Sequence, residues 1–295
     1  MRASPPFEIN VETPGLDALF LSVLGCTVRI RCQEGEARRL LTGNYVLRHE
    51  SPEHVELEYE IGKYREGSSY FLQRGGQLVR TVTEADDLLF FFEEDLTLEL
   101  QRVRANLYFL HAAALEWRGK AYLLVAPSGN GKSTTTWALL HHGFDYLSDE
   151  LGPVDLNTLK VHPYPHALCL KAEPPAAYPL PAGVLRTTQT FHIPPDTLPG
   201  KVSTDPLPLA ALFFLQYSPG ASSPVVQSLS KAEAGVRVFA SALNPLAHPG
   251  EGLDGAIKIA AASPCFKLTT ADLPSTCRLV QTTIERLVGE IENNH

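Results

Sequence analysis

The sequence predicts an α/β protein in two parts, a smaller α+β module over residues 1–105 and an α/β domain over residues 106–295. Three observations support this fold class. Short segments of alternating apolar and polar residues, typical of half-buried strands, dominate the first hundred residues. Farther along, an apolar run leads into a glycine-rich segment at Ala126–Thr134, and a helical pattern follows. Hydrophobic residues make up 44% of the chain and charged residues 20%, as in ordinary globular proteins.

The N-terminal part is expected to form a sheet and one helix. Alternation predicts strands at Phe7–Val11, Thr27–Cys32 and His54–Ile61, and Tyr70–Val79 has the pattern of two strands joined at Gly75-Gly76. The predicted helix has one apolar stripe, whose members recur at steps of three and four residues: Leu89, Phe92, Leu96, Leu100, Val103 and Leu107. The acidic triplet Glu93–Asp95 is expected on the exposed face of this helix.

The second part is expected to form a sheet flanked by helices. Two apolar runs, Leu107–Trp117 and Ala121–Val125, are separated by a short turn and are predicted to be neighbouring strands. The helix that begins in the glycine-rich segment should end near His142, since Gly143 supplies a left-handed stop. The remaining predicted elements are a short strand at Phe144–Leu147, which Leu151–Val154 could continue, a buried strand at Leu209–Leu215, and helices at Lys231–Leu243 and Asp272–Ile291. Residues 163–224 are rich in proline, so turns and extended loops should dominate there.

The glycine-rich segment matches the phosphate-loop pattern G-x-x-x-x-G-K-[ST] except at its first position, where Ala126 replaces glycine. In such a loop, backbone N–H groups and the N-terminus of the following helix surround a phosphate. The alanine is acceptable only if its φ is negative. We expect the loop to bind a nucleotide, with Lys132 on the β- and γ-phosphates and Ser133 on Mg²⁺. The full set of expected nucleotide-binding residues is Ser128, Gly129, Asn130, Gly131, Lys132, Ser133 and Thr134.

An acidic pair follows the loop at a short interval. Asp149 stands 17 positions after Lys132, one helix and one short strand later, so the pair Asp149-Glu150 should return to the side of Ser133. One carboxylate could then take a proton from an attacking hydroxyl group while the other helps to hold the metal. Without the phosphate loop, the same Ser-Asp-Glu sequence would be interpreted as a solvated turn after a strand.

Residues 107–155 resemble the kinase core of HPr kinase/phosphorylase, and they resemble the HPr-kinase-related proteins of bacterial gene clusters more closely. The shared features are His111, which lies 21 positions before Lys132, the strand pair, the phosphate loop, the helix ending at His142-Gly143, and Ser148-Asp149-Glu150. The resemblance implies a phosphoenolpyruvate-carboxykinase-like mixed sheet, ATP and Mg²⁺ as cofactors, and phosphoryl transfer to a hydroxyl group. It implies that Asp149 is the general base, that Glu150 acts on Mg²⁺ together with Asp149, and that His111 lies near the phosphates beside Lys132. It does not reach the N-terminal module.

The acceptor is expected to be a Ser of a peptide or small protein, or a small hydroxylated metabolite. The resembled kinases bind HPr through a Glu-Ile-Arg-Gly-Leu-Gly segment, which is replaced here by Tyr164–Lys171, so HPr itself is not the expected acceptor. Lys171, Arg186 and Lys201 are weaker candidates for contact with substrate, and Lys171 is more simply interpreted as a surface lysine. An ATP-binding regulatory protein without transfer activity and a nucleotide hydrolase remain as alternatives. Because the resembled kinases are commonly oligomeric, a homo-oligomer is a further possibility.

Composition excludes some classes of function. The net charge of −8 argues against non-specific binding to nucleic acid, whose phosphates would be repelled. The N-terminus lacks the apolar run of a signal peptide and no segment has 18 uninterrupted apolar residues, so neither secretion nor membrane spanning is expected. The five cysteines, an odd number without a C-x-x-C pair, are expected to be reduced and mostly buried thiols in the cytoplasm.

Overall fold

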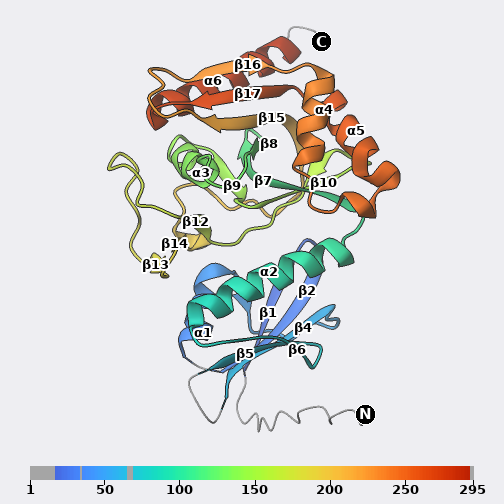
Figure 1. The fold of residues 1–295 in the computed structure, drawn as a ribbon, viewed down its shortest axis with the longest axis vertical. Coiled ribbons are helices and arrows are strands. Elements are labelled where there is room, and N and C mark those ends of the chain that lie inside the picture. The colour runs from blue at the N-terminus through green and yellow to red at the C-terminus, as the bar shows by residue number, and fades with distance from the viewer. Residues whose placement is uncertain (1–16, 34, 65–68, 293–295) are drawn as a thin grey trace, which may run out of the picture. The chain divides into compact units, whose positions relative to one another are not determined.

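The computed structural model describes residues 17–33, 35–64 and 69–292, with side chains as far as residue 289. The chain divides into two compact units (Figure 1): unit 1 comprises residues 1–42 and 47–97, and unit 2 comprises residues 43–46 and 98–295. The division falls within one long helix, α2 (Ala85–Val103), whereas the sequence placed a boundary near residue 105. Sheets and helices occur together, so the predicted α/β class is confirmed. The strand predicted at Phe7–Val11 lies outside the described residues.

Unit 1 contains a six-stranded sheet with the order β3-β1-β2-β4-β5-β6. Its strands are β1 (Asp17–Val23), β2 (Cys26–Cys32), β3 (Leu47–Arg48), β4 (Leu57–Lys63), β5 (Tyr70–Arg74) and β6 (Gln77–Val82). The strands predicted around residues 27–32 and 54–61, and the hairpin at Gly75-Gly76, are confirmed. The sequence did not indicate β1, because three consecutive residues, Leu19, Phe20 and Leu21, are buried and leave no alternation. Helix α1 (Glu36–Asn44) was also missed.

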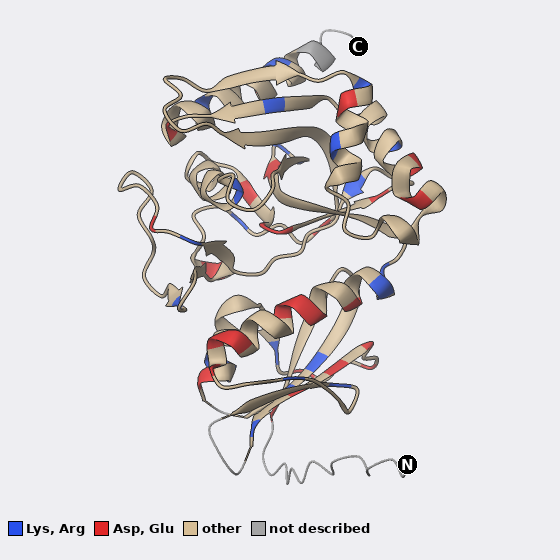
Figure 2. Ribbon diagram, viewed as in Figure 1, with Lys and Arg blue, Asp and Glu red and all other residues tan. Residues whose placement is uncertain are grey.

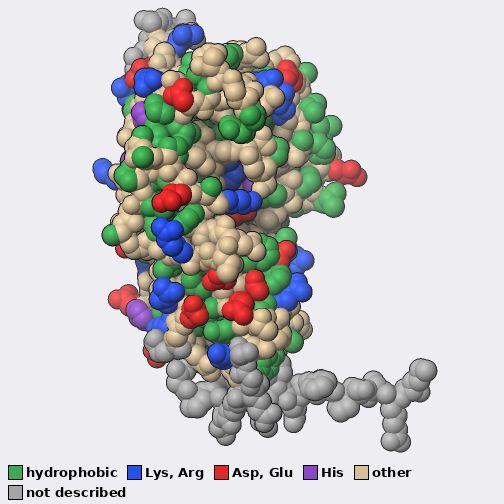
Figure 3. All heavy atoms as spheres, turned by 60° about the vertical axis from the view of Figure 1, so that its left-hand side comes forward, with side chains coloured by type: hydrophobic (Ala, Val, Ile, Leu, Met, Phe, Trp, Pro, Cys, Tyr) green, Lys and Arg blue, Asp and Glu red, His purple; other side chains and the backbone are tan. Residues whose placement is uncertain are grey.

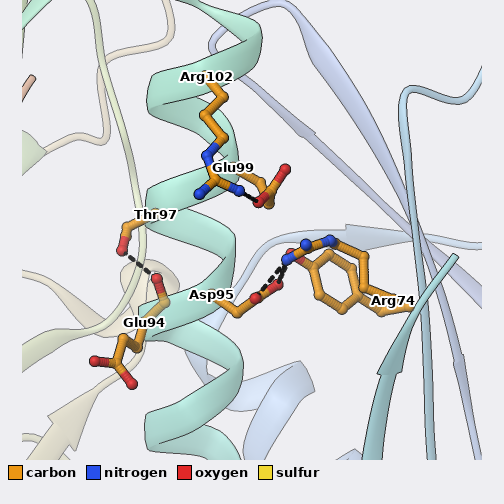
Figure 4. Close-up of polar contacts among 7 residues, drawn as sticks. Arg74, Glu94, Asp95, Thr97, Glu99 and Arg102 are labelled. Atoms are coloured by element: carbon orange, nitrogen blue, oxygen red, sulfur yellow. Dashed lines mark hydrogen bonds and ion pairs between the residues drawn. The ribbon is translucent and has the colours of Figure 1, made fainter. Parts of the chain in front are cut away.

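Helix α2 buries the predicted stripe at Leu89, Phe92, Leu96 and Leu100. The stripe ends there, because Val103 is exposed and a turn follows it. Acidic residues are spread along α2 (Figure 2), but the expectation that all of Glu93–Asp95 is exposed is wrong for Glu93 and Asp95, which are partly buried. Arg74 Nη1 donates to both carboxylate oxygens of Asp95 at 2.5 Å, and Tyr59 Oη donates to Oδ2 at 2.7 Å (Figure 4). Asp95 therefore ties α2 to β4 and β5.

Unit 2 is built on a mixed eight-stranded sheet with the order β11-β10-β7-β8-β15-β17-β16, in which β9 also pairs with β7. The strands are β7 (Leu107–Trp117), β8 (Lys120–Val125), β9 (Asp145–Ser148), β10 (Leu151–Asp155), β11 (Lys160–Val161), β15 (Leu207–Tyr217), β16 (Val225–Ser228) and β17 (Cys265–Thr270). The predicted pairing of β7 with β8 is confirmed, and it is antiparallel. Strand β15 runs parallel to both β8 and β17. The segment after Glu150 does not continue β9, because β10 is a separate strand that pairs with the first half of β7.

Helices cover both faces of this sheet (Figure 1). Side chains of the central strands point to the two faces in turn, so that each face has a hydrophobic core of its own. On β7, Ala113 and Leu115 pack in the core with α3 (Lys132–His141) and α6 (Leu273–Glu292). Ala112 and Ala114 pack in the opposite core with α4 (Lys231–Ala240) and α5 (Leu253–Ala262). Helices α3, α4 and α6 were predicted, whereas α5, β16 and β17 were not. Helix α4 ends before Leu243, whose N–H instead donates to the Phe109 carbonyl at 2.8 Å.

The proline-rich region is mostly turns and loops, as predicted. It also holds a small sheet of order β12-β14-β13, formed by β12 (Leu168–Leu170), β13 (Leu185–Arg186) and β14 (Phe191–Ile193). Short 3₁₀ helices occur at Pro195–Thr197, Pro245–Ala247 and Pro249–Gly252. Four of the five cysteines, Cys26, Cys32, Cys265 and Cys277, are buried, and Cys169 is partly buried. Among the helices of the described residues, none has the length and apolar character needed to cross a membrane.

Candidate functional site

The phosphate-loop sequence connects the central strand β8 to helix α3. Gly129 and Gly131 adopt φ values of 84° and 79°, a left-handed conformation that favours glycine. Ala126 is buried and is not among the residues with positive φ, so the condition for replacing the first glycine is met. Helix α3 has no side-chain N-cap. Its first N–H groups therefore remain available to an anion at the loop.

Lys132 and Asp149 come together at the start of α3. The Lys132 side chain is buried, and its Nζ donates a hydrogen bond to the main-chain carbonyl of Asp149. The contact joins the loop to the acidic pair, as the sequence predicted, but through the backbone of Asp149 and not through its carboxylate. The Asp149 carboxylate thus stays available to another partner.

The acidic pair occupies the tight turn between β9 and β10, which Ser148 closes by donating from Oγ to the Leu151 carbonyl. Asp149 is 3% exposed, and its Oδ2 accepts from the Cys169 N–H at 3.4 Å. Its Oδ1 is buried and has no hydrogen-bond partner among the described residues. Glu150 is exposed, and its carbonyl accepts from the Ala112 N–H at 3.2 Å. The two carboxylates therefore differ in solvation, and only Asp149 is desolvated.

His111 lies on β7 directly opposite Leu151, the first residue of β10. This register places the half-buried imidazole beside the acidic turn. Burial lowers the pKa of His111, and the positive charges of Lys132 and Lys171 lower it further, against the opposing effect of Glu150 and Asp149. His111 is therefore neutral near pH 7 and lies among four charged groups of the site.

Lys171 also belongs to the site, although the sequence favoured a plain surface lysine. It is exposed and follows β12, and its Nζ donates to Ser128 Oγ of the phosphate loop at 2.8 Å. Figure 3 shows basic, acidic and histidine side chains gathered in a hollow of unit 2. A second ammonium group thus stands at the loop. Nothing in the local sequence pattern distinguishes Lys171, because its position depends on how residues 164–171 return to β9.

His166 is a residue of the site that the sequence did not single out. Its side chain is buried, and neither ring nitrogen has a hydrogen-bond partner among the described residues. Burial is the main cause that lowers the pKa of His166, and Lys132 lowers it as well, whereas Glu150 and Asp149 raise it. The imidazole therefore lies within electrostatic reach of the same charged groups as His111.

Arg186 and Lys201 make other contacts. The Arg186 guanidinium lies over the Phe191 ring at 4.7 Å from its centroid. Lys201 pairs with β9 through its backbone, because its N–H donates to Asp145 Oδ1 at 2.7 Å and its carbonyl accepts from the Tyr146 N–H at 2.7 Å. The Lys201 side chain is exposed. These contacts give both residues structural roles.

The residues present fit a magnesium nucleotide. In the described part of the chain, no group of three or more His, Cys, Asp or Glu side chains is arranged to hold a metal by itself. Mg²⁺ in nucleotide sites usually takes one or two carboxylates together with phosphate oxygens and water, so such a group is not required. Ser133 Oγ, the exposed Glu150 and the Asp149 carboxylate offer the oxygen ligands that Mg²⁺ prefers.

No known protein-family model matches this chain, and no curated protein matches it. The chemistry of the site therefore rests on its own residues and their geometry.

Proposed function

We propose that the protein is an ATP- and Mg²⁺-dependent kinase that transfers the γ-phosphoryl group to a hydroxyl group. The observation that supports this most directly is the hydrogen bond from Lys132 Nζ to the main-chain carbonyl of Asp149, a residue with a buried carboxylate. The acceptor would be a Ser of a peptide or small protein, or a small hydroxylated metabolite. The resemblance to HPr-kinase-related proteins, with their phosphoenolpyruvate-carboxykinase-like fold, agrees with this proposal.

Phosphate binding would involve the backbone N–H groups of the loop and two lysines. The left-handed conformation of Gly129 and Gly131 would let the loop N–H groups face a phosphate, and the N-terminus of α3 would add partial positive charge. Lys132 would turn from the Asp149 carbonyl to the β- and γ-phosphates. Lys171, already on Ser128, would neutralise charge on the transferred group. Ser133, Glu150 and Asp149 would hold Mg²⁺, which would neutralise the negative charge of the phosphates.

Asp149 would act as the general base. Its carboxylate would accept the proton of the acceptor hydroxyl as the oxygen–phosphorus bond to the acceptor forms. The bond from the γ-phosphorus to the bridging oxygen breaks, and ADP leaves with that electron pair. Positioning and charge neutralisation supply most of the barrier reduction in such transfers. The buried position of Asp149 suits this role, because low solvation strengthens its interaction with a proton donor.

Two alternatives use the same residues. A nucleotide hydrolase would accept water in place of the acceptor, and ATP turnover would then need no second substrate. A regulatory protein would bind ATP without turnover. The unpartnered oxygen of Asp149 favours phosphoryl transfer over ATP binding without turnover, since a protein that only binds ATP has no use for a desolvated base.

Substitution of Lys132 tests the phosphate loop. Lys132→Ala removes a charge-assisted contact, a class of interaction worth about 1.5 to 3 kcal/mol. We expect Mg-ATP affinity in titration calorimetry to fall by about 10- to 150-fold. Lys258→Ala is the matched control, because Lys258 is exposed on α5, across the sheet from α3. If Lys132→Ala binds Mg-ATP like the wild type while remaining folded, the loop does not bind the nucleotide.

A further inference from the structure

The segment from Tyr164 to Cys169 is fixed along β9 and the acidic turn. The Tyr164 N–H donates to the Leu147 carbonyl at 3.0 Å, and the Cys169 N–H donates to Asp149 Oδ2 at 3.4 Å. Between these two points, Tyr146 Oη donates to the His166 carbonyl at 3.0 Å. The backbone on both sides of His166 is therefore anchored to β9 and to the turn that holds Asp149.

Packing alone does not explain a histidine at position 166. The side chain is 4% exposed and neither ring nitrogen has a partner among the described residues, which costs free energy for a buried polar group. The ring lies against the aromatic rings of Tyr164 and Tyr45, at centroid distances of 5.0 and 6.3 Å. A phenylalanine would fill the same aromatic environment without an unpartnered nitrogen.

His166 and Asp149 have complementary hydrogen-bonding needs. A neutral imidazole carries one N–H donor, whereas a carboxylate oxygen only accepts. Burial keeps His166 neutral, and Asp149 Oδ1 is a buried acceptor without a partner among the described residues. Lys132 Nζ meanwhile donates to the main-chain carbonyl of Asp149 and so holds the backbone at this residue.

We propose that His166 is a positioning residue for Asp149. When the nucleotide draws Lys132 Nζ to the phosphates, Asp149 loses the hydrogen bond to its main-chain carbonyl, and its side chain is free to adjust. The His166 N–H then donates to Asp149 Oδ1 and orients the carboxylate toward the acceptor hydroxyl. This inference rests on the proposed kinase function. It requires His166 to act on the transition state and to leave ground-state nucleotide binding unchanged.

The test compares MgADP with MgADP–aluminium fluoride, which imitates the phosphoryl group in transfer with water in the position of the acceptor. Calorimetry measures both affinities for the wild type, His166→Phe, His166→Asn and His166→Gln. We expect His166→Phe to bind MgADP like the wild type. Its preference for the analogue over MgADP should be about tenfold smaller than that of the wild type. Asn and Gln keep an N–H donor near the position of Nδ1 or Nε2, so at least one of them should recover much of this preference.

Thermal unfolding separates this role from a structural one. His166→Phe should melt no lower than the wild type, since it removes an unpartnered polar group. His192→Phe is the control, because the buried His192 ring bonds to Asn44 Oδ1 at 2.7 Å and Thr190 Oγ1 at 2.6 Å, and its loss should lower the melting temperature. An unchanged analogue preference in His166→Phe, or no recovery in either amide variant, overturns the positioning role. A wild type that fails to bind MgADP, or that shows no preference for the analogue, contradicts the proposed kinase instead.

Discussion

Asp149 combines two features that rarely occur together in one carboxylate. It is almost completely buried, yet one of its oxygens has no hydrogen-bond partner among the described residues. Its other oxygen receives a backbone N–H at 3.4 Å, and its carbonyl receives the Lys132 ammonium. A carboxylate that served only the fold would be expected to have both oxygens paired. The unpaired oxygen is therefore best explained by a partner that it gains when the nucleotide binds, such as the His166 N–H.

Asp149→Asn should separate binding from chemistry. The amide keeps the shape of the side chain, but it accepts a proton poorly. We expect Mg-ATP affinity close to that of the wild type, because the amide oxygen can still contact Mg²⁺ and the other proposed ligands, Ser133 and Glu150, are unchanged. Loss of the γ-phosphoryl group from labelled ATP should be slower by about 10² or more. Asp155→Asn is the control, since Asp155 ends β10 and accepts the backbone N–H groups of Asn157 and Thr158 in its own turn. A wild-type rate in Asp149→Asn would rule out its role as base.

The sequence was sufficient to predict that the residues on one continuous strand-loop-helix-strand unit lie close together. Lys132 and Asp149 meet because α3 and β9 are short, and His111 joins them through the register of β7 with β10. Lys171 and His166 could not be anticipated in this way. The contact of Lys171 with Ser128 spans 43 positions, and it depends on long-range packing of a proline-rich segment that has no periodic pattern.

Strand β9 positions the acidic turn, and a loop holds its outer edge. The Tyr146 N–H donates to the Lys201 carbonyl at 2.7 Å, and the Ser203 N–H donates to the Tyr146 carbonyl at 2.8 Å. On the other side, β9 pairs with β7. Local patterns predicted β9, but they could not predict this loop, because it pairs through its backbone and its sequence is that of an ordinary turn.

Gly200 allows the loop to approach β9. A Cβ atom at this position would stand 2.3 Å from the Phe144 carbonyl oxygen, which is a backbone atom. Gly200→Ala should therefore push the loop from β9 and lower the free energy of unfolding by about 1 to 3 kcal/mol. Urea titration checks this value. The control is Gly289→Ala in α6, where a Cβ meets no atom within 4 Å and a gain of up to about 1 kcal/mol is expected. Equal stabilities of Gly200→Ala and the wild type would contradict the close approach.

Unit 2 as a whole concentrates the groups whose pKa is shifted by burial. Burial lowers the pKa of His111, His142, His162 and His166 below the ordinary value of 6.5. It raises the pKa of Cys265 to about 11 and that of Cys277 to about 12, from an ordinary value of 9.0. In the described part of unit 1, resolved shifts occur at Glu58 and Tyr59. The free energy of unfolding of unit 2 should therefore depend on the protonation of these histidines at acid pH and of these thiols at alkaline pH.

The sign follows from the protons that each state binds. Between the lowered histidine pKa values and 6.5, the unfolded chain binds more protons than the folded unit, so stability falls as the pH drops through this window. Above 9.0, unfolded thiols lose protons that the folded unit keeps, so stability falls as the pH rises. We expect the highest free energy of unfolding near about pH 7 to 8, with lower values at about pH 5.5 and about pH 10.

Tryptophan fluorescence during urea titration measures this directly, because the two tryptophans of the chain, Trp117 and Trp137, both lie in unit 2. Replacing Cys265 and Cys277 together by Ala should flatten the alkaline slope and leave the acid slope unchanged, since each slope depends on different groups. A free energy of unfolding that stays constant or rises from about pH 7.5 to about pH 5.5 would contradict the burial of neutral histidines. If the alkaline slope persists in the double variant, the buried tyrosines are its cause. Burial raises the pKa of one of them, Tyr108, to about 12.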